Sequence, residues 1–172
     1  MKVFIILKGN PCMSEIHTLR NSVSLGEGAE FRNGETCEGV AYALLTSEGE
    51  VDPTRDFARI QVTRRYPLDG LLYAQNNGSQ ERVEVTSGEG YLLRAKTSGY
   101  MSRIALRPGV VVTIEPGELF AWWQTAWDDT KEPLGFDMIC TPPFDPEQYT
   151  YISIDEGIAV NDNERKLDEV QS

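Results

Sequence analysis

The chain has 172 residues, of which 40% are hydrophobic and 25% are charged, a balance typical of globular rather than disordered proteins. Its length predicts one domain with a substantial core. The formal net charge of −11 argues against a nucleic-acid partner and against an anionic membrane surface, because both are bound through clustered Lys and Arg side chains.

The cysteines and the apolar runs bear on the compartment. Cys12, Cys37 and Cys140 form no CxxC pair, and an odd number cannot all pair within one chain, which favours a reducing compartment. The apolar run over residues 3–7 is too short for a signal peptide. No run approaches the roughly 20 apolar residues that span a bilayer. We therefore expect a cytoplasmic protein without a membrane partner.

Residues 1–38 are expected to form an N-terminal arm. Residues 2–7 are β-prone and favour an outer strand. Residues 8–38 show little periodicity and contain several glycines, so we expect them to be irregular. Met13 is an alternative to Met1 as the natural start, and the sequence leaves both open.

From residue 39 onward, short β-prone segments alternate with turns. Between residues 57 and 65, Ile60 and Val62 alternate with Gln61 and Thr63, the period of two that indicates a strand with one buried face. About ten short strands with almost no helical periodicity predict an all-β antiparallel sandwich or barrel. We expect this barrel over residues 39–154, followed by a short acidic tail over 155–172. The other expected strands are 40–46, 71–75, 81–86, 91–95, 101–106, 110–114, 120–125, 136–140 and 150–154.

The spacing of several residues resembles the first conserved motif of the cupin superfamily. That motif has two histidines one residue apart, then a glutamate and a glycine. Gln75 and Asn77 stand at the two histidine positions, Glu81 at the glutamate and Gly88 at the glycine.

A second segment resembles the second cupin motif. Gly109 and Gly117 match its two glycines, whereas Glu115 stands at a proline position, Phe120 at a histidine and Gln124 at an asparagine. Together with the Pro-Pro-Phe segment at 142–144, the resemblance covers residues 58–148. It implies a double-stranded β-helix, or jelly-roll, barrel with one pocket.

The missing histidines decide which cupin chemistry is expected. The family's metal sites use imidazole nitrogens and a carboxylate, which suit iron, manganese, nickel, copper or zinc. Here two amides and one aromatic ring replace the imidazoles, and the single histidine, His17, lies in the arm. Calcium or magnesium on Glu81 and the amides is also disfavoured, since such sites gather more oxygens. We therefore expect no metal and no cofactor, and a metal-dependent dioxygenase is disfavoured.

Strand alternation places every second side chain on one face, and the resemblance points that face into the barrel. The resulting cavity has aromatic walls and a few hydrogen-bonding groups, which is typical of a small-molecule site. The alternative is that these side chains only pack the core. The side chains expected to face the interior are Tyr73, Gln75, Asn77, Phe120, Trp122 and Gln124, of which the last five are expected to bind the substrate.

Glu81 is the main candidate for catalysis. Burial beside aromatic rings should raise its pKa and suit it to proton transfer near neutral pH. The alternative is a structural acid paired with Arg64, Arg94 or Arg103, or satisfied by the neighbouring amides. Tyr73 is expected to supply a second proton-handling group or an oxyanion donor.

Two classes of function stay open for this metal-independent barrel. One is a cofactor-free isomerase, epimerase, cyclase or lyase that acts on a small organic molecule. The other is a non-catalytic binding or regulatory barrel. Asp137 is a weaker site candidate because its facing is undetermined, and Cys140 is expected to be a small buried residue. We also expect a homodimer, formed through barrel edges and residues 2–7.

Overall fold

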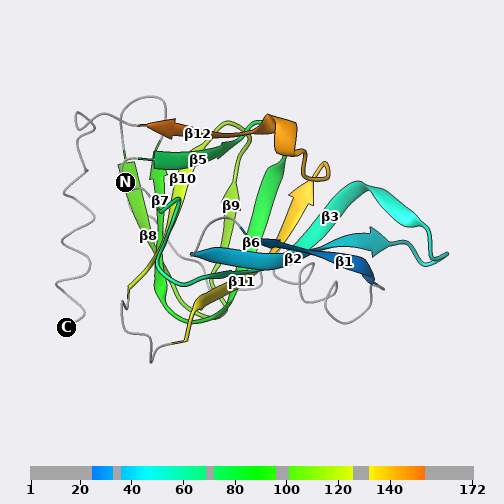
Figure 1. Cartoon of the computed structure of the whole chain (residues 1–172), viewed down its shortest axis with the longest axis horizontal. Helices are drawn as coiled ribbons and strands as arrows, with labels where there is room; N and C mark the ends of the chain where they lie inside the picture. Colours follow the sequence, from blue (N-terminus) through cyan, green and yellow to red (C-terminus); the bar gives the residue numbers. More distant parts are fainter. Residues whose placement is uncertain (1–24, 33–35, 69–71, 96–100, 126–131, 154–172) are drawn as a thin grey trace.

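Strands joined by short turns make up nearly all of the chain that the structure describes (Figure 1). This computed structural model describes residues 25–32, 36–68, 72–95, 101–125 and 132–153. One short 3-10 helix, η1 (Pro146–Gln148), precedes the last strand. The strands are β1 (Leu25–Arg32), β2 (Cys37–Leu45), β3 (Val51–Val62), β4 (Arg65–Tyr66), β5 (Leu72–Asn76), β6 (Gln80–Ser87), β7 (Gly90–Ala95), β8 (Met101–Leu106), β9 (Val111–Ile114), β10 (Leu119–Gln124), β11 (Leu134–Thr141) and β12 (Tyr149–Ser153).

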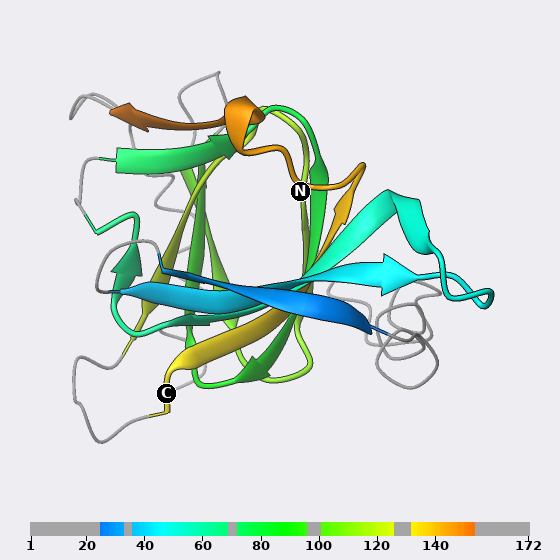
Figure 2. The same ribbon diagram turned by 45° about the vertical axis from the view of Figure 1, so that its right-hand side comes forward.

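The strands form two antiparallel sheets on opposite sides of a common interior (Figure 2). Sheet A has the order β1-β2-β3-β11-β6-β9. Sheet B has the order β12-β5-β10-β7-β8, and β4 pairs with β10 beside it. The all-β antiparallel architecture expected from the sequence is therefore confirmed. Among the described residues, no helix is long and apolar enough to cross a membrane.

Each strand expected between residues 40 and 154 has a counterpart, and the differences lie toward the N-terminus. Residues 25–32 were expected to be irregular, and this expectation is wrong: they form β1 and pair with β2. Asp52 and Pro53, a pair typical of turns, lie inside β3 instead. The β11 ladder ends at Asp56, so Pro53 has no second partner strand among the described residues, and its missing N–H is tolerated there. The outer strand at 2–7 and the tail lie outside the described residues.

The interior of the barrel is closed by apolar side chains from both sheets. Val62, Val83 and Ile114 of sheet A and Leu92 of sheet B are fully buried, together with Leu134 of β11. Burial of each such side chain contributes about 1.5–3 kcal/mol, so this cluster holds the two sheets together.

A second apolar layer lies on the outer face of sheet B. Tyr73, Ala95, Leu119 and Ala121 form a buried cluster that is separate from the barrel interior. Consequently β5 and β10 carry buried apolar side chains on both faces, so burial alone does not distinguish the inner face of these strands from the outer face.

Candidate functional site

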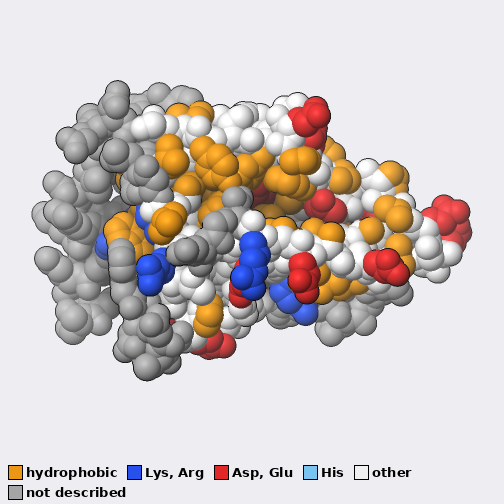
Figure 3. All heavy atoms as spheres, viewed as in Figure 1, with side chains coloured by type: hydrophobic (Ala, Val, Ile, Leu, Met, Phe, Trp, Pro, Cys, Tyr) orange, Lys and Arg blue, Asp and Glu red, His pale blue; other side chains and the backbone are white. Residues whose placement is uncertain are grey.

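A cavity of about 600 Å³ lies inside the barrel, between the edge strands β1 of sheet A and β12 of sheet B. Figure 3 shows hydrophobic side chains gathered around a hollow between these edges. Its walls come from the inner faces of β2, β3, β6 and β11, from β4 and β10, and from the segment that precedes β12. The volume is that of a site for a small organic molecule.

Aromatic rings form most of the cavity wall. The Trp122 and Phe136 ring centroids are 4.5 Å apart, and the Phe120 and Trp122 rings meet edge to face at 6.0 Å. Phe120 and Trp122 thus lie on the inner face of β10, as alternation together with the cupin resemblance predicted. The nine aromatic residues that line the cavity are Phe31, Phe57, Tyr66, Phe120, Trp122, Phe136, Phe144, Tyr149 and Tyr151.

Glu81 lies on β6 and lines the same cavity, with only 2% of its surface exposed. Asn76 donates its Nδ2–H to Glu81 Oε1 at 2.8 Å and is its only hydrogen-bond partner among the described residues. Burial raises the pKa of Glu81 to about 7; the Asn76 hydrogen bond opposes this shift, and the nearby Asp56 carboxylate adds to it. Glu81 is thus a buried acid without a cationic partner in the described part of the chain.

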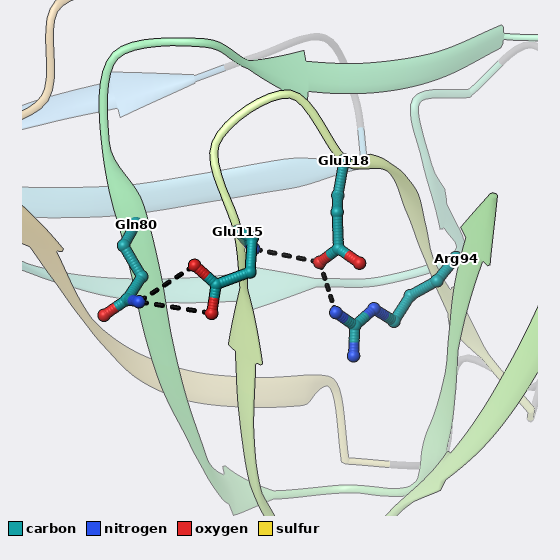
Figure 4. Close-up of polar contacts among 4 residues, drawn as sticks. All are labelled: Gln80, Arg94, Glu115 and Glu118. Carbon is teal, nitrogen blue, oxygen red and sulfur yellow. Dashed lines mark hydrogen bonds and ion pairs between the residues drawn. The ribbon is translucent and has the colours of Figure 1, made fainter. Parts of the chain in front are cut away.

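Of the three arginines considered as partners of Glu81, Arg64 is exposed and does not line the cavity, and the other two are engaged elsewhere. Arg94 pairs with Glu118 at the turn between β9 and β10 (Figure 4). The Arg103 guanidinium lies 4.3 Å from the centre of the Tyr91 ring. Neither supplies a counter-charge to the cavity.

A second carboxylate, Asp56, lies close to Glu81. Cys140 of β11 pairs with Asp56 of β3 on one side and with Glu81 of β6 on the other, so the three side chains form a row across the inner face of sheet A. Asp56 accepts hydrogen bonds from the Phe144 backbone N–H at 2.9 Å and from the Cys140 thiol, while burial raises its pKa. Burial likewise raises the pKa of Cys140 well above its usual range.

Asp56 was not among the residues expected at the site, although the sequence carries a signal for it. Asp56 precedes Ala58 and Ile60 at the two-residue period of their buried face, so extending the strand by one residue would have found it.

Three tyrosine hydroxyls meet at the β12 side of the cavity. The Tyr66 and Tyr151 hydroxyls are 2.7 Å apart, and Tyr149 donates its hydroxyl to Tyr66 at 3.3 Å. Tyr149 pairs with Asn76, the partner of Glu81, across β12 and β5. Burial raises the pKa values of Tyr66 and Tyr149 well above the usual range, so both hydroxyls stay protonated and act as hydrogen-bond donors.

The predicted facing of β5 is wrong. Ala74 and Asn76 point into the barrel, whereas Tyr73 lies on the outer face with Leu119 and Ala121. The Tyr73 hydroxyl donates to the Met101 sulfur at 3.2 Å there. Because this face is also buried and apolar, alternation alone does not say which face looks inward. Tyr73 therefore does not line the cavity.

The predicted amide positions also lie away from the cavity. Gln75 donates its Nε2–H to the Gly117 carbonyl at 2.7 Å, and Asn77 is exposed in the loop after β5. Gln124 is buried at the far end of β10, where its Nε2–H bonds the Glu132 carbonyl at 3.0 Å. None of the three lines the cavity, so their expected contact with substrate has no support in this geometry.

The residues at the family's metal-ligand positions do not fit a metal. Gln75 and Asn77 lie outside the cavity, and Phe120 offers only an aromatic ring. No group of three or more His, Cys, Asp or Glu side chains within the described ranges is arranged to hold an ion. His17 lies outside those ranges, and the expectation of no metal stays a prediction for elemental analysis.

No protein-family model matches the chain, and no curated protein matches its sequence. Its fold is nevertheless similar to solved structures. A Streptomyces Pac13 variant with uridine matches with a TM-score of 0.55 and 16% identity, over 78% of this chain and 92% of Pac13. Another Pac13 structure, described as that of a nucleoside dehydratase, matches with the same score and identity over 77% and 91%.

Oxalate decarboxylase from Bacillus subtilis is a second kind of structural neighbour. It matches with a TM-score of 0.50 and 17% identity, over 71% of this chain and only 28% of the decarboxylase. At these identities the likeness concerns the fold, and both neighbours are cupin barrels. The protein therefore has a cupin-type jelly-roll fold.

Proposed function

We propose that the protein is a cofactor-free enzyme that moves a proton on a small organic molecule held in the cavity, with Glu81 as the general acid and base. Glu81 carries this proposal. It is a buried carboxyl at the wall of a 600 Å³ cavity, with a pKa of about 7 and one carboxylate oxygen without a hydrogen bond from the described residues. A pKa near the working pH lets one group both accept and return a proton.

The neighbours of Glu81 have separate tasks in this mechanism. Asn76 holds Oε1, which leaves Oε2 to accept a proton from a substrate that lies against Phe120 and Trp122. Tyr149 lines the cavity and pairs through its backbone with Asn76, and its hydroxyl, which bonds Tyr66 in the structure, would turn to the substrate as the oxyanion donor that the sequence assigned to Tyr73. The proton then returns from Glu81 to another atom, which gives an isomerisation, epimerisation or cyclisation, or leaves with a departing group in a lyase reaction.

The structural neighbours support this reaction class only broadly. Pac13 is described as a nucleoside dehydratase, and removal of water requires a base and an acid in one pocket. With 16% identity, neither uridine nor dehydration is transferred to this chain as such. Lyase activity is therefore tested alongside isomerase, epimerase and cyclase activity and is not assumed.

A non-catalytic binding barrel is the second candidate, because aromatic rings dominate the cavity wall and would bind an apolar ligand without chemistry. Deuterium exchange separates the two. Carbonyl, sugar and aromatic metabolites are incubated with the protein in D2O and followed by NMR. We expect deuterium at a carbon of a bound compound with the parent chain and not with Glu81→Gln. A ligand that binds and stays unlabelled and unchanged over hours would favour the binding barrel.

We further propose that the protein works as a cytoplasmic homodimer. Among the described strands β1 is an edge strand of sheet A, and an unpaired edge is a ready surface for pairing with a second chain. Light scattering should give about twice the chain mass of 19.3 kDa. A monomer at micromolar concentration would contradict the dimer.

A further inference from the structure

We propose that the ligand of this cavity carries a positive charge, as a protonated amine or quaternary ammonium group on an aromatic or apolar skeleton. The inference rests on the cavity being the ligand site of the proposed function, and it does not require catalysis. Three features carry it: the charges of the lining residues, the aromatic walls and the surroundings of Glu81.

The charged groups of the cavity are almost all negative. Asp56 and Glu81 contribute carboxylates to its lining, and Glu30 lies at its edge on the exposed strand β1. Arg32 is the single Lys or Arg among the described lining residues, and its side chain is 81% exposed and paired with Glu38 at 3.4 Å. An anionic ligand would therefore meet like charges without a cationic partner inside, while the net charge of −11 attracts cations to the protein.

The walls supply the second feature. Aromatic rings attract a cation over their faces through the ring quadrupole, and indole is the strongest of these rings. Trp122, Phe120 and Tyr149 line the same cavity as Glu81. Rings combined with a carboxylate favour an ammonium group over a neutral group of the same shape, because only the cation gains from both.

The third feature is that Glu81 has no cation among its neighbours in the part of the chain that the structure describes. Glu81 faces three titratable side chains: Asp56 from β3, Cys140 from β11 and Tyr149 from β12. Tyr149 in turn donates a hydrogen bond to Tyr66 of β4. β5 contributes the neutral Asn76, and β9 pairs Ile114 with Glu81. A bound cation would be the missing counter-charge. It would also lower the pKa of Glu81, so that binding near pH 7 releases a proton.

The test compares probes of one shape and three charges. Tryptamine, tryptophol and indole-3-acetate carry a cationic, a neutral and an anionic group on the same indole, and uridine serves as a further neutral probe. Binding is measured by titration calorimetry at pH 6.5 in two buffers of different ionisation enthalpy, which counts protons. We expect tryptamine to bind about tenfold or more tightly than tryptophol, with net proton release, and indole-3-acetate to bind least.

Variants locate the effect. Glu81→Gln should lose most of the preference for tryptamine and the proton release. Glu115→Gln is the matched control, because Glu115 is exposed on the turn between β9 and β10, where it accepts hydrogen bonds from Gln80 (Figure 4), and it does not line the cavity. It removes the same charge and should keep both properties. Proton release by the parent chain is an independent readout if Glu81→Gln does not fold.

The inference is overturned if tryptophol or uridine binds as tightly as tryptamine, if tryptamine binding takes up a proton, or if tryptamine does not bind. These outcomes can be distinguished from outcomes that contradict the proposed catalytic function. A neutral substrate whose turnover depends on Glu81 would sink the inference and keep the enzyme. Tryptamine-type binding with proton release, without turnover of any amine, would keep the inference and remove the catalytic role.

Discussion

The two faces of sheet A each bury a carboxylate, and they treat it differently. Asp137 of β11 lies on the outer face, 1% exposed, and accepts two hydrogen bonds from Arg59, at 2.9 Å from Nε and 3.4 Å from Nη2. Glu81 of the adjacent strand β6 lies on the inner face, 2% exposed, with one amide partner and a second acid nearby. Burial alone therefore does not mark a functional acid.

The difference is whether the fold supplies a counter-charge. A buried carboxylate with a bidentate guanidinium recovers much of its desolvation cost from the ion pair. Without a cation, the acid instead binds a proton more tightly, which is the raised pKa of Glu81. Asp137 is thus a paired structural acid, and Glu81 is the candidate acid for contact with a ligand.

The largest expected effect is on turnover. Once a substrate is found, Glu81→Gln should lower kcat by about 100-fold or more, because it keeps the shape but removes the proton-transfer group. Steady-state rates for this variant are compared with those for Glu115→Gln, which should match the parent. If Glu81→Gln turns over substrate as fast as the parent, Glu81 is a structural acid like Asp137, and the two residues do not differ in function.

The next effect is a pH-dependent stability. The pKa of Glu81 is raised from its ordinary value of 4.5 to about 7, so the folded state holds this proton more tightly than the unfolded state. As the pH rises from 4.5 to 7, Glu81 should therefore lower the free energy of unfolding of the parent by about 3 kcal/mol. Glu81→Gln should lack this contribution. Urea unfolding at pH 4.5 and pH 8.5 measures the difference between the two chains. A difference that does not change with pH would contradict the raised pKa.

Removing the structural acid should cost stability rather than activity. Asp137→Asn replaces an ion pair by a weaker amide contact with Arg59, and we expect a loss of about 2 kcal/mol in the free energy of unfolding near pH 7. Ligand affinity should stay close to that of the parent, since Asp137 lies on the face away from the cavity. A loss of binding without a loss of stability would reverse the roles assigned to the two faces.

The smallest expected effect concerns Asp56. Its carboxylate adds to the raised pKa of Glu81, although less than burial does. Asp56→Asn should therefore move the pH dependence of binding or turnover to lower pH, with a modest change in its maximum. A pH profile of the variant against the parent checks the direction. A shift to higher pH would show that Asp56 does not act on Glu81 as a negative charge.

Much of the fold follows from local sequence. Turn residues and β-prone runs predicted ten of the strands, because these preferences act between near neighbours along the chain. The motif spacing also pointed to Glu81 and to the inner face of β10, with Phe120 and Trp122, and the structure places all three at the cavity. At these positions the motif marked the face that looks inward, whereas on β5 the same resemblance marked Gln75 and Asn77, which lie away from the cavity.

Other parts of the site were decided by tertiary structure. Alternation along β5 says that Tyr73 and Ala74 point in opposite directions, but both faces of this strand are buried, so the pattern does not choose between them. The partners of Glu81 also come from distant segments: Asp56 through β11, and Tyr149 through the pairing of β12 with β5. Their proximity depends on strand order and register, which are set by the packing of whole sheets and not by the residues near Glu81 in sequence.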